Sequence, residues 1–126
     1  MLQKTLSPLE QEAMNIVWEL KECSIRDVLK QFNHEKKLAY TTAATLLQRL
    51  FEKGLVNRNN QNTILSYTPK VSKEMYGKKM AKSFIQSFIS SFGEIAIVSF
   101  AESIDKLPKE KRDYLLELLE KQHENK

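Results

Sequence analysis

The sequence predicts a mainly α-helical protein with one small β-hairpin, divided into two parts, residues 1–70 and 71–126. Three observations support this fold class. Apolar residues recur at the helical period of about 3.6 in several separate segments. Residues 55–68 instead contain two short strand-like runs around a polar turn. After Pro69 the apolar residues become strongly aromatic, which indicates a second helical part of different character.

The first helix is predicted to begin at Pro8, whose missing N–H costs nothing at the first helical position. Ser7 and Glu10 have the spacing of a capping box, in which each side chain accepts from the other residue's backbone amide. Glu10 and the other acidic residues of this helix are expected to be solvated. The buried stripe is expected to contain Leu9, Ala13, Ile16, Val17 and Leu20, with Trp18 at its edge.

The second helix is predicted to follow Ser24, which forms a second capping box with Asp27. Its buried residues are expected to be Val28, Leu29 and Phe32. After a polar connection, a third helix is predicted from Tyr40 to Gly54, because glycine readily takes the left-handed conformation that ends a helix. The apolar face of this third helix contains Ala43, Leu46, Leu47 and Leu50.

The opposite face of the third helix is suited to the DNA major groove. Its small or neutral polar residues are Thr41, Ala44, Thr45 and Gln48. Thr and Gln hydrogen-bond base edges, small residues allow close approach, and phosphates repel carboxylates, of which Glu52 is the first. An ordinary amphipathic helix with a solvated polar face is the alternative. Three short helices, the last with such a face, are typical of a helix-turn-helix.

Positive charge is concentrated in residues 36–82. This segment has ten basic residues against Glu52 and Glu74, a net charge of +8, so the remainder carries −4 of the total of +4. A separation of charge of this kind predicts contact with a polyanion. A solvated lysine-rich face is the alternative.

A β-hairpin is predicted directly after the third helix. Residues 55–58 and 63–68 are the expected strands, residues 59–62 the polar tip, and Pro69 the end of the pairing. A hairpin in this position is the wing of a winged helix. Arg58 and the asparagines of the tip are then expected near the DNA backbone or minor groove, although any solvated turn contains similar residues.

Residues 71–126 are predicted to form three helices, beginning at Ser72, about Glu94 and Pro108, with Gly93 separating the first two. These helices carry more apolar surface than about 55 residues can cover alone, which predicts a symmetric dimer. The alternative is that they fold back on the first part. The residues expected in the dimer interface are Phe84, Phe88, Phe92, Ile97, Phe100, Leu115 and Leu118.

Other classes of protein are poorly supported. No apolar stretch is long enough for a membrane span, and the N-terminus lacks the apolar core of a signal peptide. The single Cys23 fits a reducing cytoplasm and is expected to be a buried structural thiol. His34 and His123 have neither metal-ligand nor catalytic-triad spacing. We therefore expect a cytoplasmic protein that is not an enzyme and has no metal or cofactor.

These motifs together resemble the penicillinase-repressor family, which includes repressors of the BlaI and MecI type and has copper-responsive CopY repressors as relatives. The resemblance covers nearly the whole chain. It rests on residues 7–10 (SPLE), residues 24–29 (SIRDVL), Tyr67-Thr68-Pro69 and, most specifically, residues 39–56.

The resemblance implies a cytoplasmic homodimeric winged-helix repressor that binds a palindromic operator in double-stranded DNA and controls resistance or homeostasis genes. Together with Gln48 from the polar face, the residues expected to contact DNA are Ala39, Tyr40, Thr41, Thr42, Ala44 and Thr45 on the helix, and Arg58 and Asn62 on the wing. A winged-helix protein-interaction module and a non-specific architectural DNA binder are the alternatives.

The resemblance also bears on how repression is relieved. Antibiotic-responsive members are cut at an Asn-Phe bond through a pathway that involves a membrane sensor protease. The matching position here is Ser99-Phe100, which keeps the Phe but not the Asn. The four-cysteine cluster of the copper-responsive members has no counterpart in this chain, so copper or zinc sensing by that route is not expected.

Overall fold

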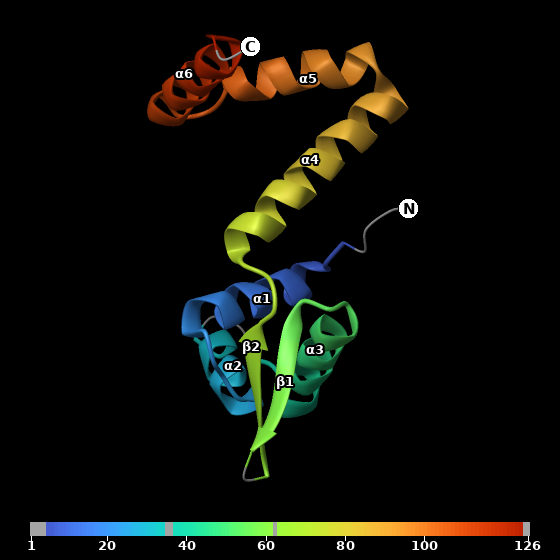
Figure 1. The fold of residues 1–126 in the computed structure, drawn as a ribbon, viewed down its shortest axis with the longest axis vertical. Helices are drawn as coiled ribbons and strands as arrows, with labels where there is room; N and C mark the ends of the chain where they lie inside the picture. Colours follow the sequence, from blue (N-terminus) through green and yellow to red (C-terminus); the bar gives the residue numbers. More distant parts are fainter. Residues whose placement is uncertain (1–4, 35–36, 62, 125–126) are drawn as a thin grey trace. The chain divides into compact units, whose positions relative to one another are not determined.

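The computed structural model describes residues 5–34, 37–61 and 63–124, and the chain divides into two compact units at residues 78 and 79 (Figure 1). The elements are α1 (Pro8–Leu20), α2 (Ile25–Phe32), α3 (Tyr40–Glu52), β1 (Val56–Gln61), β2 (Ile64–Pro69), α4 (Lys73–Phe92), α5 (Glu94–Asp105) and α6 (Lys109–Glu124). The predicted mainly α fold with one hairpin is confirmed. The functional boundary after residue 70 stays a prediction.

Local signals set the ends of the helices as predicted. In α1 the Glu10 amide donates to Ser7 Oγ at 3.2 Å, and the Ser7 amide donates to Glu10 Oε1 at 2.8 Å. Ser24 and Asp27 form the same reciprocal pair in α2. Gly54 after α3 has a φ of 77°, a conformation that other residues adopt only with strain. In both capping boxes, two residues three positions apart fix the beginning of the helix.

The core of the first unit lies between α1, α2, α3 and the hairpin, which pack against one another (Figure 1). It contains Ala13, Met14, Val17, Cys23, Ile25, Val28, Phe32, Ala43, Leu46, Leu47, Leu50, Leu55, Val56 and Tyr67. Leu9, Ile16, Leu20 and Leu29, which were expected in the core, are only half-buried at its margin. Two backbone hydrogen bonds between Cys23 and Tyr67 tie β2 to the segment between α1 and α2. The hairpin is therefore anchored to the helical core.

The hairpin is longer than the sequence predicts. Its antiparallel register runs from Val56 opposite Pro69 to Gln61 opposite Ile64. The expectation of a tip at residues 59–62 is wrong for 59–61, because pairing with residues 64–66 outweighs the low strand propensity of asparagine. The strand pairing ends at Pro69, as expected, and one further backbone hydrogen bond follows it, from the Lys70 amide to the Leu55 carbonyl at 2.9 Å.

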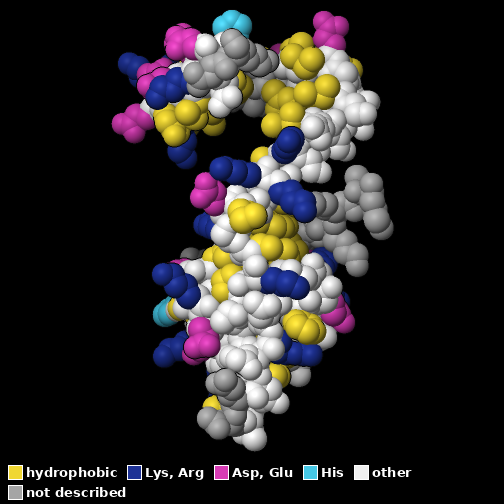
Figure 2. All heavy atoms as spheres, viewed as in Figure 1, with side chains coloured by type: hydrophobic (Ala, Val, Ile, Leu, Met, Phe, Trp, Pro, Cys, Tyr) yellow, Lys and Arg dark blue, Asp and Glu magenta, His cyan; other side chains and the backbone are white. Residues whose placement is uncertain are grey.

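In the second unit α4 and α5 are joined by an aromatic cluster. The centroid of the Phe88 ring lies 5.6 Å from the ring centroid of Phe84, 4.9 Å from that of Phe92 and 5.4 Å from that of Phe100. Among residues 79–124, however, Ala96 alone is buried. Hydrophobic side chains form patches on the visible surface of α5 and α6, between charged side chains (Figure 2). This unit therefore has no closed core of its own within one chain.

Candidate nucleic-acid interface

Helix α3 exposes part of the face that the sequence selects, and Ala44 and Gln48 on this face are half-buried. Thr41 and Thr45 are exposed, and Tyr40 is 48% exposed. Thr42 is half-buried, as is Ala44, which packs partly against the core. The Thr45 hydroxyl donates to the Thr41 carbonyl at 2.9 Å, so its oxygen remains available to accept a hydrogen bond from DNA.

The start of α3 also suits a phosphate. Ala39 occupies the N-cap and makes no side-chain cap hydrogen bond. The first turn of the helix contains no acidic residue. Amides at an uncapped helix N-terminus carry partial positive charge and bind anions. The helix end that holds Tyr40 is therefore electrostatically compatible with the DNA backbone.

The structure brings Gln48 of α3 and Arg58 of β1 together. Nη1 of Arg58 donates to Gln48 Oε1 at 2.5 Å, and the guanidinium carbon lies 4.2 Å from the centroid of the Phe51 ring. Gln48 Nε2 faces the carboxylate of Glu52 at 3.4 Å. Sequence reasoning chose Gln48 and Arg58 separately but gave no signal that they touch. Asn62, the other expected wing contact, lies outside the described residues.

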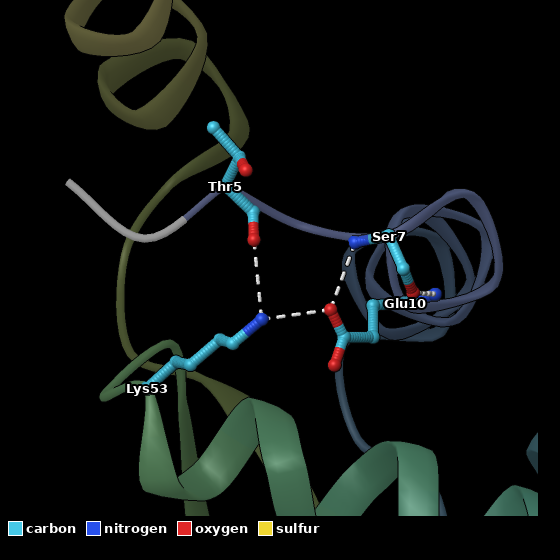
Figure 3. A network of polar contacts seen from close by, with 4 residues as sticks. All are labelled: Thr5, Ser7, Glu10 and Lys53. Carbon is cyan, nitrogen blue, oxygen red and sulfur yellow. Dashed lines mark hydrogen bonds and ion pairs between the residues drawn. The ribbon is translucent and has the colours of Figure 1, made fainter. Parts of the chain in front are cut away.

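Two lysines of the basic segment form ion pairs within the described residues: Lys78 with Glu74, both exposed, and Lys53 with a buried carboxylate. Lys53, at the end of α3, donates to the Glu10 carboxylate at 2.8 Å and to the Thr5 carbonyl at 3.1 Å (Figure 3). The expectation that Glu10 is solvated is wrong, because it is only 3% exposed. The Lys53 ammonium and the Ser7 amide hold the pKa of Glu10 below its ordinary value, against the opposing effect of burial. Lys53 is thus a structural cation that joins α1 to α3.

The residues expected in the dimer interface fall into two groups. Phe84, Phe92, Ile97 and Leu118 are exposed. Phe88, Phe100 and Leu115 are half-buried, the first two because they pack in the aromatic cluster. Ser99 is exposed, and the bond between it and Phe100 lies in the interior of α5.

Other kinds of site find little support in the described part of the chain. Residues 5–34, 37–61 and 63–124 contain no group of three or more His, Cys, Asp or Glu side chains that could hold a metal. None of their helices is long and apolar enough to cross a bilayer. Cys23 is buried, as expected, and burial with the nearby Asp27 and Glu22 raises its pKa to about 11. A thiol in this state is a poor nucleophile.

Comparison with known proteins agrees with this geometry. The family model of the penicillinase repressor matches residues 6–121. The penicillinase repressor of Bacillus licheniformis is 26% identical over 121 residues, 96% of this chain and 93% of that protein. The methicillin resistance regulatory protein MecI of Staphylococcus aureus (strain N315) is 29% identical over 100 residues, 79% of this chain and 81% of that protein. The solution structure of the DNA-binding domain of the repressor BlaI matches with a TM-score of 0.51 and 25% identity, over 57% of this chain and 88% of that domain. The chain belongs to the penicillinase repressor family.

Proposed function

We propose that this DNA-binding transcriptional repressor acts in the cytoplasm as a homodimer on a palindromic operator of a resistance or stress operon, and that proteolysis in the C-terminal part relieves repression. One observation supports the proposed DNA-binding surface: the exposed residues of α3 before Glu52 are neutral or basic, with no carboxylate among them. Its family confirms that the chain is not an enzyme.

The proposed DNA-binding surface combines α3 and the wing. With α3 in the major groove, Tyr40, Thr41 and Thr45 are the exposed candidates for base and phosphate contacts. Ala39 and Ala44 allow close approach of the helix. The full set of residues that we propose for the DNA-binding surface, whether they contact DNA or position a neighbour that does, is Ala39, Tyr40, Thr41, Thr42, Ala44, Thr45, Gln48, Arg58 and Asn62.

The open second unit supports the proposed homodimer. Ile95 is 70% exposed and Ile97 56% exposed, and most of the other large apolar residues of α5 and α6 are exposed as well. Burying such surface contributes roughly 25 cal/mol per Å² of apolar area, which a single chain does not gain here. A second copy would cover it in an isologous interface and hold two copies of α3 about one DNA turn, or a multiple of it, apart.

The same architecture supports relief by proteolysis. Cutting α5 between Ser99 and Phe100 would divide the proposed interface, because Phe100, Leu115 and Leu118 would be lost from the DNA-binding unit. The weakened interface would lower the avidity of the linked pair. The bond lies within a helix, and the Phe100 ring packs 5.4 Å from Phe88 and 6.4 Å from Phe84. Cleavage therefore requires local opening of α5, so that a signal that loosens this cluster would speed it.

The proposal is tested by capturing genomic DNA. Purified protein is mixed with sheared DNA of its own organism at about 150 mM salt, where non-specific binding is weak, and the retained fragments are sequenced. Enrichment of a few palindromic promoter sites is expected. Thr45→Glu, on the exposed face of α3, should abolish the enrichment. Gln31→Glu, which makes the same change of charge at an exposed position of α2, should retain it. Uniform retention would identify an architectural DNA binder, and no retention would favour a protein-interaction module.

A further inference from the structure

The Arg58 side chain packs against α3 through two contacts, neither of which a phosphate contact requires. Its Nη1 donates to Gln48 Oε1 at 2.5 Å, and its guanidinium lies over the Phe51 ring at 4.2 Å. We propose that Arg58 is a positioning residue, which fixes the Gln48 amide in the orientation that reads adenine in the major groove. This inference rests on the proposed function, because it requires that α3 reads an operator.

The orientation of the Gln48 amide follows from the chemistry of its neighbours. Arginine has only donors, so Gln48 must turn its carbonyl oxygen toward Arg58. An ionised carboxylate only accepts, so the amide nitrogen must face Glu52, whose Oε2 lies 3.4 Å away. A rotated amide would place two donors together on one side and two acceptors on the other. Both neighbours therefore select the same orientation.

The fixed amide retains the pattern of groups that adenine recognises. After its contacts with Arg58 and Glu52, Gln48 keeps one lone pair on Oε1 and one hydrogen on Nε2. Adenine offers the complementary pair, the N6 donor and the N7 acceptor. Guanine offers two acceptors at its N7 and O6, one of which would oppose the amide oxygen. An oriented Gln48 thus discriminates against guanine, whereas a freely rotating amide discriminates less.

The positioning role differs measurably from a phosphate contact. Loss of a side chain that neutralises a phosphate lowers the slope of log K against log salt by about one and weakens all sequences alike. Loss of a positioning residue leaves that slope nearly unchanged and relaxes the preference at a single base pair. The two roles can therefore be separated with one variant.

The experiment uses full-length wild type, Arg58→Met, Gln48→Ala and the double variant. Arg49→Met is the matched control, since it also removes one positive charge, from an exposed position of α3, the helix that contains Gln48. Each protein is mixed with a duplex library randomised around the captured operator, and bound duplexes are sequenced. Affinity is also measured by fluorescence anisotropy across a salt series, and circular dichroism verifies that each variant is folded.

We expect the wild type to prefer adenine by about tenfold at one position of each half-site. Arg58→Met should reduce this preference to less than about threefold, with an unchanged salt slope. Gln48→Ala should remove it, and the double variant should lose nothing further. Arg49→Met should keep the preference.

Three results would overturn the inference. If Arg58→Met keeps the adenine preference and lowers the salt slope by about one, Arg58 contacts a phosphate, and the proposed function still stands. If Gln48→Ala changes a position where another base is preferred, the assignment to adenine is wrong. If the wild type shows no base preference at any position, the proposed function and this inference both fail.

Discussion

Removal of the Glu10 carboxylate should weaken the first unit by about 2–4 kcal/mol. In Glu10→Ala the Ser7 amide loses its acceptor at 2.8 Å, and loss of a cap costs about 1 kcal/mol. Lys53 Nζ loses its carboxylate at 2.8 Å. Breaking a buried ion pair costs about 3–5 kcal/mol, an upper limit here because Lys53 keeps the Thr5 carbonyl and its side chain is 21% exposed.

Urea unfolding at fixed protein concentration measures this effect, with the fluorescence of Trp18, the single tryptophan, as the probe. Glu19→Ala, which removes an exposed carboxylate from the same helix, is the control and should change the free energy of unfolding by less than about 0.5 kcal/mol. In a double-mutant cycle, Lys53→Met should add little to Glu10→Ala. A Glu10→Ala variant whose free energy of unfolding falls as little as that of the control would refute the reasoning. Full additivity of the effects of Glu10→Ala and Lys53→Met would also refute it.

The same pair predicts a dependence of stability on pH. Because the folded state lowers the pKa of Glu10, its contribution is fully present above the unfolded value, ordinarily about 4.3 for glutamate, and disappears as the pH falls through the folded value. The stability difference between wild type and Glu10→Ala should therefore be constant near neutral pH and shrink below about pH 4.3. A difference that grew on acidification would contradict the assigned direction.

Three further predictions concern other sites. Cys23, with its pKa raised to about 11, should react with iodoacetamide at pH 8 at least about 100-fold more slowly in the folded chain than in urea, and equal rates would contradict its burial. Ile97→Asp, at a 56% exposed position of α5, should convert the proposed dimer to monomer in sedimentation, whereas Ser103→Asp on the same helix should not. Lys53→Met should leave the salt slope of DNA binding unchanged because its ammonium is already paired, and a decrease of about one would show a phosphate contact.

Features encoded by neighbouring residues were predictable from the sequence. The capping boxes at Ser7 and Ser24, and the end of α3 before Gly54, depend on residues within three or four positions. The apolar and polar faces of α3 follow in the same way from helical period alone. Such local signals were sufficient for the fold class and for the polar face of α3. The choice of Ala39, Tyr40 and Thr42 depended on the resemblance to the family.

Features that depend on distant pairing were not predictable. Glu10 and Lys53 are 43 positions apart, and no local pattern distinguishes this carboxylate from the exposed Glu19. The contact between Gln48 and Arg58 requires the register of β1 against β2 and the packing of β1 on α3. The strand that includes Asn59 was missed for the same reason, because cross-strand partners outweigh the propensity of single residues.

The central claim, that two linked copies of α3 read one palindrome, is tested most directly by the stoichiometry of the complex with DNA. Sedimentation of wild type with full-operator and half-operator duplexes gives both the mass and the affinity. We expect two chains on the full operator, bound at least about 100-fold more tightly than the half-operator, because the second contact is intramolecular. One chain on the full operator, with an affinity equal to that for the half-operator, would contradict the account.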